Sequence, residues 1–592
     1  MTVQAGLAAA GRQAAEIGHA IAGYAVASCD IFDTAVMRRL ARPEDVLLAA
    51  GLRLQAAGLT DCDPAAFQLL RRQAERSTRA AAEAAGHDEV RIGEIYAHLH
   101  ACGVVRDPVA AAAIEFAAEC AACQSIAAVH QALAARPPGQ RLVFVSDSIW
   151  PAAQLAQLLE GCGYGAECQV FASADHRRSK HAGGLFALVA AALGCRPADI
   201  VHLGDNPHSD GVQARAAGFA AHILPWRMPP PEPEADAALP PLARLAHSHR
   251  RSRAATATGD PPALSQYAAL LLIGFSFFVL AEARRRGAPR IFFLARDGYL
   301  PLAVARRIIA RTGQVVTLDY LHVSRHAVVT EAADPAGRAA ALAYLRHAGF
   351  IAEDTAAPPL IVDVGWRGSL QTSLAELTGR PVAGCYLGLW AEALRPALSP
   401  SNAAGYLFAF GHPAPRAAIV REGYILLEML FSAPHGTVIG YSAAGAPLHA
   451  PEAEPAGTVR RNALAALEAD TLALVETLGD LIGGAWPEHL DPDAALFDIA
   501  GVLASPTAAQ VAQFNAIPFI HAADPADPAL RVAVNRVPPH EFLLQPRAVL
   551  RRLHDAPWRA GALRASLPWP LPSMDFPTFR DRFERLLRLV QR

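Results

Sequence analysis

The sequence predicts an α/β protein: a Rossmann-like, doubly wound parallel sheet with a helical cap insertion, followed by a second α/β domain. Short continuous apolar runs alternate with helical patterns, which is typical of a parallel sheet covered on both faces. About a hundred residues between the first two runs show helical periodicity and almost no strand signal. A Pro-rich, charged stretch interrupts the 592-residue chain, which is too long for one hydrophobic core.

Five apolar runs are the predicted strands of the first sheet. Three of them end in Asp at the carboxyl edge, where ligands bind in open α/β sheets. The helical insertion, at about 38–138, follows the first run and would lie above that edge, where a lid controls water. The runs cover residues 24–30, 141–147, 167–173, 199–205 and 218–224.

The Pro-rich stretch 226–262 predicts a linker between a domain at 22–225 and a larger α/β domain at 263–592. The most apolar run, Tyr267–Ala281, is shorter than the roughly 20 residues that span a bilayer. We therefore expect a buried helix there and no stable membrane insertion.

Composition narrows the function classes. The chain is 52% hydrophobic and 18% charged, which indicates a packed globular protein. With a formal net charge of −2 there is no electrostatic reason to expect nucleic acid as a partner. Its nine cysteines are scattered, which favours a reducing, cytoplasmic location over a secreted disulfide framework.

Polar side chains follow the predicted strands at one edge of the sheet. Converging carboxylates repel one another unless a cation joins them, and Mg²⁺ prefers such oxygen ligands. A lysine and hydroxyl groups beside the ion suit a phosphoryl group, and a carboxylate after the first strand can act as nucleophile. The candidates are Asp30, Asp33 and Thr34 after the first run, Ser146 in the second, Lys180 beyond the third, and Asp205 and Asp210 around the fourth.

Residues 22–225 resemble the haloacid dehalogenase superfamily, whose phosphatases work through an aspartyl intermediate. The motifs that carry the likeness are "DIFDT", "VFVSD", "SKHAGGLF" and "HLGDNPHSD", in that order. The resemblance implies a Mg²⁺-dependent hydrolase or phosphotransferase acting on a small phosphorylated metabolite. Its implied roles are Asp30 as nucleophile with Thr34 at the usual place four residues on, Ser146 as the phosphate-binding hydroxyl and Lys180 as neutralising charge. The implied metal ligands are Asp30, Asp205, Asp210 and the Phe32 backbone carbonyl.

One residue departs from that pattern. The phosphatases of the superfamily usually carry an Asp two residues after the nucleophile, which serves as general acid and base; here it is Phe32, followed by Asp33. Such help is worth about 10²–10⁴-fold. Three alternatives follow. Asp33 takes the place of the missing acid, although successive strand residues normally point to opposite sides. Otherwise the enzyme is slow or transfers the phosphoryl group to an acceptor other than water, or the domain binds its ligand without turnover. Dehalogenation tolerates a non-acid at this position, but it leaves Asp205 and Asp210 without a role.

The C-terminal part repeats the pattern of apolar run, glycine turn and helix. Arginines at such turns suit phosphate or carboxylate recognition, so we predict a second anionic-ligand pocket. The alternative is that the arginines pair with the aspartates to hold the loops. The residues of this pocket are Arg296, Asp297, Arg325, Asp363, Arg367 and Ser369.

The "FLARDG", "DVGWRGSLQ" and "LFSAPHG" stretches resemble the C-terminal region of large bacterial proteins described as predicted hydrolases of the same superfamily. Those proteins often accompany surface-polysaccharide and glycosyltransferase genes. The resemblance implies a sugar phosphate as substrate and glycosyltransferases or polysaccharide-assembly proteins as partners. A second hypothesis is a degenerate binding module attached to a C-terminal transferase or glycan-assembly scaffold.

Overall fold

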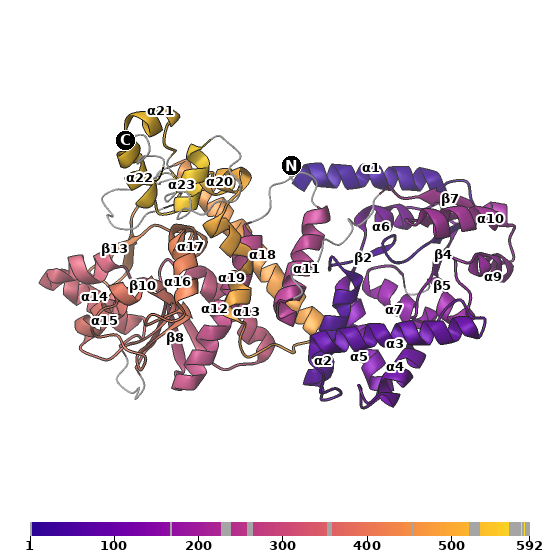
Figure 1. Cartoon of the computed structure of the whole chain (residues 1–592), viewed down its shortest axis with the longest axis horizontal. Coiled ribbons are helices and arrows are strands. Elements are labelled where there is room, and N and C mark those ends of the chain that lie inside the picture. The colour runs from indigo at the N-terminus through magenta and orange to yellow at the C-terminus, as the bar shows by residue number, and fades with distance from the viewer. Residues whose placement is uncertain are drawn as a thin grey trace. The chain divides into compact units, whose positions relative to one another are not determined.

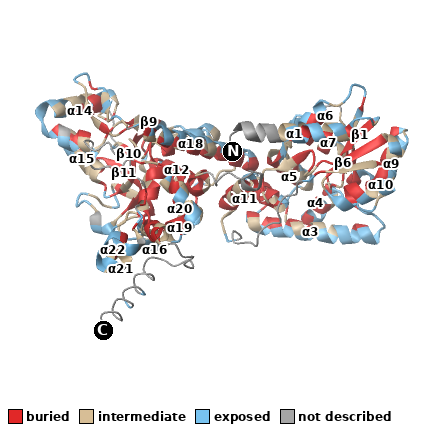
Figure 2. Cartoon of the chain, turned by 90° about the horizontal axis from the view of Figure 1, so that it is seen from above, coloured by how far each residue is buried: buried red, intermediate tan, exposed pale blue. Residues whose placement is uncertain are grey.

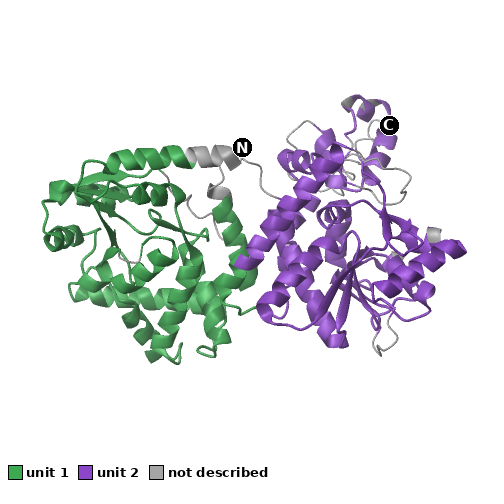
Figure 3. Ribbon diagram, turned by 180° about the vertical axis from the view of Figure 1, so that it is seen from behind, with its two compact units in different colours: residues 1–260, 477–486 green, residues 261–476, 487–592 purple. Residues whose placement is uncertain are grey.

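The chain forms two compact units, each built on a five-stranded parallel sheet, in the computed structural model (Figures 1 and 3). Unit 1 comprises residues 1–260 and 477–486, and unit 2 comprises residues 261–476 and 487–592. This architecture confirms the predicted α/β class. The structure describes residues 3–165, 168–225, 238–256, 264–351, 358–452, 454–519, 533–534, 536–567, 582 and 585.

The sheet of unit 1 has the strand order β5-β4-β1-β6-β7, and every neighbouring pair is parallel. All five predicted runs form strands. Because β1 is central and pairs with β4 and β6, the residues that follow these three strands meet at one edge. The strands are β1 (Val26–Cys29), β4 (Arg141–Ser146), β5 (Gln169–Ala172), β6 (Ile200–Gly204) and β7 (Ala220–Ile223).

Helices pack on this sheet through side chains that alternate along each strand. Val143 and Val145 of β4 join a buried cluster with Phe186 and Val189 of α9. The intervening Phe144 contacts Tyr164 at a ring-centroid distance of 5.3 Å on the other side. Within residues 3–225, the helices outside the insertion are α1 (Val3–Ile21), α6 (Ala127–Ala134), α7 (Ala152–Gly161), α8 (Ser173–His176), α9 (Gly184–Leu193) and α10 (Ala214–Ala216).

Four helices occupy the insertion after β1, and a two-stranded antiparallel ribbon, β2 (Val36–Arg38) with β3 (Cys123–Ser125), joins its ends. Asp-Pro pairs begin two of these helices, because the Asp side chain accepts free backbone N–H groups and Pro needs none. Arg71 and Glu115 form a buried ion pair inside the insertion. The helices are α2 (Val46–Ala56), α3 (Pro64–Ala84), α4 (Ile92–Ala101) and α5 (Pro108–Ala122).

The predicted linker is wrong in part. Of residues 226–262, the segments 226–237 and 257–262 lie outside the described residues, but the middle forms the helix α11 (Pro241–Thr256), which belongs to unit 1. Ala41 donates backbone hydrogen bonds to the carbonyl (3.2 Å) and hydroxyl (2.9 Å) of Ser248. Apolar side chains at helical spacing, such as Leu242 and Leu245, are buried. The unit boundary therefore falls after residue 260 and not at 225.

Unit 2 has the strand order β12-β11-β10-β8-β9, again all parallel. A small antiparallel hairpin, β13 (Val438–Tyr441) with β14 (Pro447–His449), lies in the same unit. The sheet strands are β8 (Arg290–Leu294), β9 (Thr317–Leu321), β10 (Leu360–Trp366), β11 (Ala383–Leu389) and β12 (Ala403–Phe408).

The remaining helices belong to unit 2, except that residues 477–482 of the longest one belong to unit 1. In the described part they are α12 (Ser265–Arg286), α13 (Tyr299–Thr312), α14 (Pro335–His347), α15 (Ser369–Thr378), α16 (Ala414–Arg421), α17 (Tyr424–Leu430), α18 (Ala456–Ile482), α19 (Pro492–Ala504), α20 (Ala508–Asn515), α21 (Pro539–Leu544), α22 (Pro546–His554) and α23 (Arg559–Ser566). The helix α12 contains the predicted buried run but extends over 22 residues, so by length and composition it passes as a membrane span. However, 83% of its most apolar window is buried inside the protein, as a core helix would be (Figure 2).

Candidate active site

Three charged side chains meet at the carboxyl edge of the first sheet. Lys180 lies 2.5 Å from Asp30 Oδ1 and 2.7 Å from Asp210 Oδ1 through its Nζ atom. Asp30 follows β1, Asp210 lies in the π-helical turn η3 (Pro207–Gln213) after β6, and Lys180 lies in the loop after α8. All three are buried. The sheet topology therefore brings together residues that are up to 180 positions apart in the sequence.

Asp210 is held by donors on every side. Besides Lys180, His202 Nε2 lies 3.1 Å from Asp210 Oδ1, and the backbone N–H of Asn206 donates to Oδ2 at 3.0 Å. His202 Nδ1 contacts the Ser28 hydroxyl at 2.8 Å, which fixes the orientation of the ring. Although burial opposes it, Lys180 and His202 hold the pKa of the Asp210 carboxyl well below its usual range. Burial lowers the pKa of His202 in spite of Asp210, which favours the neutral imidazole. Asp210 is a permanent anion that fixes Lys180.

Asp30 and Asp205 have fewer partners. Thr34 Oγ1 lies 3.4 Å from both Asp30 Oδ2 and Asp205 Oδ1. Burial raises the pKa of Asp30 to about 7 in spite of Lys180. Burial and the nearby Asp210 raise the pKa of Asp205 to about 6. The positive charge of Lys180 is therefore not enough to offset burial and mutual repulsion at these two carboxyl groups.

The donor set fits a divalent cation. One oxygen each from Asp30, Asp205 and Asp210 lie within 4.8 Å of one another. Three carboxylates and one ammonium leave a net charge of −2 in this site, which a Mg²⁺ ion would neutralise with the hard oxygen ligands it prefers. Such an ion would also return the pKa values of Asp30 and Asp205 toward those of ordinary carboxyl groups.

Gly204, the last residue of β6, is required by the close approach of Asp210. A Cβ atom at this position would lie 2.2 Å from Asp210 Cγ, a distance that side chains do not tolerate. The glycine in "HLGD" therefore allows η3 to fold back against the strand end. Any larger residue would displace the carboxylate that holds Lys180.

Asp147, directly after β4, orders the lysine loop. Its carboxylate accepts the backbone N–H groups of Lys180 at 2.6 Å and His181 at 3.0 Å. The preceding Ser146 is buried at the end of β4, next to Ala172 of β5 in the sheet register. Its position at a strand end made Asp147 visible in the sequence, but only the fold shows that it acts on backbone groups of the loop.

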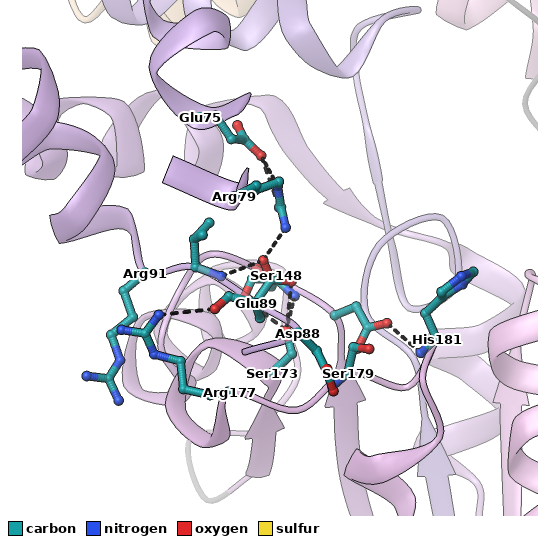
Figure 4. Close-up of polar contacts among 12 residues, drawn as sticks. Glu75, Arg79, Asp88, Glu89, Arg91, Ser148, Ser173, Arg177, Ser179 and His181 are labelled. Carbon is teal, nitrogen blue, oxygen red and sulfur yellow. Dashed lines mark hydrogen bonds and ion pairs between the residues drawn. The ribbon is translucent and has the colours of Figure 1, made fainter. Parts of the chain in front are cut away.

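A polar network connects the insertion to the loops after β4 and β5 (Figure 4). Glu89, between α3 and α4, is buried and ion-paired with Arg79 of α3. The Ser173 hydroxyl lies 3.1 Å from Glu89 Oε2 and also accepts the backbone N–H of Ser148 at 2.8 Å. Arg177 donates to the Glu89 carbonyl at 3.1 Å. The helical insertion is thereby connected to the loop that follows Ser146 and to the segment that leads to Lys180.

Phe32 and Asp33 lie in a turn and not in an extension of β1. Asp33 has a left-handed φ of 58°, and its N–H donates to the Val36 carbonyl at 2.7 Å. The expectation that successive strand residues alternate in direction therefore does not apply here. The Arg38 guanidinium lies 4.4 Å from the centre of the Phe32 ring. Burial raises the pKa of Asp33, and its charge acts on Asp205.

The second predicted pocket forms in part at the corresponding edge of unit 2. The positive charges of Arg296 and Arg325 favour the ionised form of Asp297, and the charge of Asp297 opposes ionisation of Asp363. Burial raises the pKa of Asp297 to about 7, and burial with Asp297 raises the pKa of Asp363 well above its usual range. Glu428 of α17 accepts a hydrogen bond from Trp366 Nε1 at 3.0 Å. Its negative charge also contributes to the raised pKa of Asp297.

Two further predicted residues of this pocket follow β10. Arg367 is exposed. Its positive charge partly offsets the rise that burial causes in the pKa of Tyr424. Ser369 is the first residue of α15. A cavity of about 350 Å³ in this unit lies elsewhere: Leu360 and Ala383, the first residues of β10 and β11, line it, so it opens at the amino edge of the sheet.

Solved structures of dehalogenases are similar to about a third of the chain. No protein-family model and no curated protein matches the sequence. A crystal structure of a dehalogenase is 13% identical, with a TM-score of 0.25, over 36% of this chain and 89% of that one. The L-2-haloacid dehalogenase from Xanthobacter autotrophicus is 17% identical, with a TM-score of 0.25, over 34% of this chain and 77% of that one. A dehalogenase with an intermediate complex is 13% identical, with a TM-score of 0.23, over 36% and 89%.

With identities and TM-scores this low, the assignment of the fold rests on the strand order and the parallel pairing of this chain itself. Fold and site together define a Rossmann-like α/β protein with a helical insertion and a buried carboxylate–lysine centre at the carboxyl edge of its first sheet.

Proposed function

We propose that unit 1 is a Mg²⁺-dependent phosphohydrolase or phosphotransferase of the haloacid dehalogenase type, acting through an aspartyl-phosphate on Asp30. The observation that supports this most strongly is the contact of one buried lysine with both Asp30 and Asp210, beside Asp205. A nucleophilic carboxylate must approach an anionic phosphoryl group, and that approach requires fixed positive charge. Lys180 provides one such charge, and a bound Mg²⁺ would add the second.

The reaction has two displacements at phosphorus. In the first, an Asp30 oxygen forms a bond to phosphorus, the bond to the leaving oxygen breaks, and that oxygen takes a proton. In the second, water or an acceptor hydroxyl attacks phosphorus and loses a proton, and the bond to Asp30 breaks. Lys180 holds the Asp30 carboxylate in place, and Asp147 keeps the lysine loop ordered.

Asp33 is the acid nearest to the usual position of the proton donor. Its raised pKa favours the protonated form that a general acid needs, and the turn at 31–36 removes the steric objection based on strand alternation. Phe32 itself faces Arg38. The proposal is therefore that Asp33 transfers the proton, less efficiently than an acid two residues after the nucleophile would.

The substrate we propose is a small phosphorylated metabolite such as a sugar phosphate, in the cytoplasm, with polysaccharide-assembly or glycosyltransferase proteins as partners. The insertion, fastened through Glu89, would enclose the substrate and limit access of water. A panel of phosphorylated metabolites, assayed for phosphate release with and without Mg²⁺, tests the substrate class. Release that does not depend on Mg²⁺ contradicts the proposed role of the carboxylates.

The test of the nucleophile is the covalent adduct. We expect beryllofluoride with Mg²⁺ to form a stable complex with the wild-type chain and not with Asp30→Asn. The matched control is Asp61→Asn, an exposed carboxylate of the same unit. Equal phosphate release by wild type and Asp30→Asn across the whole panel would refute catalysis at this site.

A second candidate function is a binding module for phosphorylated ligands, serving a transferase or scaffold in unit 2. Phe32, in the place of the usual acid, favours it. The variant Phe32→Asp separates the two: an increase in hydrolysis indicates an intact centre that has been tuned away from water. If this variant and the wild type both bind phosphorylated ligand without turnover, the binding module is correct.

A further inference from the structure

Three histidines from separate segments of unit 2 converge beside the second carboxylate cluster. They are His322, directly after β9, His435, in the loop before β13, and His449, the last residue of β14. One ring nitrogen from each lies within 4.8 Å of the others. All three are half-buried, so a small ion in solution can reach them. From this arrangement we propose that His322, His435 and His449 form a binding site for a divalent transition-metal ion of the Zn²⁺ class.

The nitrogen spacing suits this ion. Zn²⁺ binds imidazole nitrogen at about 2.0–2.1 Å, so two ligands of a tetrahedral site are separated by about 3.3 Å. His322 Nδ1 and His449 Nε2 are 3.1 Å apart. A small rearrangement would let an ion replace the proton that two imidazoles at this distance share.

The surrounding groups orient the rings as a metal site requires. His435 Nδ1 lies 2.9 Å from the Gly436 carbonyl, which fixes the tautomer and leaves the Nε2 lone pair available. The Tyr320 hydroxyl lies 2.8 Å from this Nε2 and donates to the same lone pair, so an ion would displace that hydrogen bond. An ion on three histidines keeps an open fourth position, which is typical of catalytic and not of structural zinc sites.

The backbone at the site is held from two directions. The N–H of His322 donates to the Tyr344 hydroxyl at 2.7 Å, and the Tyr441 hydroxyl donates to the His322 carbonyl at 2.9 Å. Val438 of β13 is paired with His449 in the hairpin, and its carbonyl accepts a hydrogen bond from Ser324 at 2.6 Å. The three ligands are therefore positioned before any ion binds, which lowers the entropic cost of binding.

The site lies beside the charged groups of the strand edge. Besides burial, the positive charge of Arg296 lowers the pKa of His435. Burial and the charge of Asp297 raise the pKa of Tyr320, whereas Arg296 lowers it. An anionic ligand held by Arg296 would therefore be near the open position of the ion. The ligand class that fits is a small anion, such as a carboxylate or phosphate ester, with an oxygen that can complete the coordination.

The experiment uses the full chain and Zn²⁺ itself, with excess Mg²⁺ present to occupy the oxygen-ligand site of unit 1. We expect about one zinc ion per chain in competition with a chromophoric chelator. We also expect a tetrahedral visible spectrum with Co²⁺ that lacks thiolate charge-transfer bands, which excludes the cysteines. If the unmodified chain loses all zinc to a weak chelator, the inference is refuted.

The variants His449→Asn and His435→Asn test the ligands individually. Each should weaken zinc binding by more than the roughly 10–100-fold that the loss of an outer partner costs, and should change the Co²⁺ spectrum. The control His347→Asn, an exposed histidine of α14, should bind as the wild type does. Wild-type zinc affinity in both ligand variants refutes this assignment, and hydrogen exchange in β9 verifies that each variant is folded.

Discussion

Replacing Asp30 by Asn should stabilise unit 1 at neutral and alkaline pH when divalent ions are absent. In the native protein burial raises the pKa of Asp30 from its ordinary value of 3.8 to about 7. The ionised form is therefore unfavourable in the folded state and favourable in the unfolded one. Asn has nearly the same shape and cannot ionise, so the variant avoids this penalty.

The magnitude follows from proton linkage. Between pH 4 and 7 the native chain holds a proton on Asp30 that the unfolded chain has released, so the free energy of unfolding falls as the pH rises through this window. The rise from 3.8 to about 7 corresponds to at most about 4 kcal/mol, fully lost above pH 7. Asp30→Asn should thus gain up to this amount over wild type at pH 8 and almost nothing at pH 4.

Hydrogen–deuterium exchange of peptides from β1 and β6 measures the local free energy of opening within unit 1, without assuming that the whole chain unfolds in one step. Mg²⁺ should stabilise the wild type, by about 2.7 kcal/mol at 100 times the dissociation constant, and the variant much less. The exposed control Asp61→Asn should change stability by less than about 0.5 kcal/mol. If Asp30→Asn is less stable than wild type at pH 8 in the presence of a chelator, the reasoning is wrong.

Three further predictions concern the lysine, its loop and the insertion. Lys180→Met leaves Asp30 and Asp210 uncompensated and should destabilise β1 and β6 by about 3–5 kcal/mol in chelator at pH 8; the loss should shrink at pH 5.5, where Asp30 is protonated, and a loss below about 1 kcal/mol at pH 8 would contradict the ion pairs. Asp147→Asn weakens two charge-assisted hydrogen bonds and should lower the free energy of opening at residues 179–182, measured by amide exchange, by about 1–2 kcal/mol. The exchange of β6 should stay unchanged and serves as the internal control. Glu115→Gln breaks the buried pair with Arg71, at 2.8 Å, and should destabilise the helices of the insertion by about 3–5 kcal/mol while β1 keeps its protection; equal loss in both regions would show that the insertion does not open separately.

The sequence by itself determined the class of fold and the strands of unit 1. Continuous apolar runs bounded by helical patterns have few alternatives to a covered parallel sheet, because such runs must be buried on both faces. Parallel pairing places the carboxyl ends of β1, β4 and β6 at one edge. The candidates Asp30, Asp205 and Asp210 could be named before the structure for that reason.

Only the tertiary structure decided how these residues are partnered. The helix α11 was hidden by the composition of a Pro-rich stretch, and it is held by segments distant in sequence, as the hydrogen bonds from Ala41 to Ser248 show. The ion pair of Arg71 with Glu115 joins residues that are 44 positions apart. The approach of His322, His435 and His449 depends on the docking of a hairpin, for which no short motif exists. Local patterns determine which segments become strands and helices, whereas contacts between segments distant in sequence depend on how those elements pack.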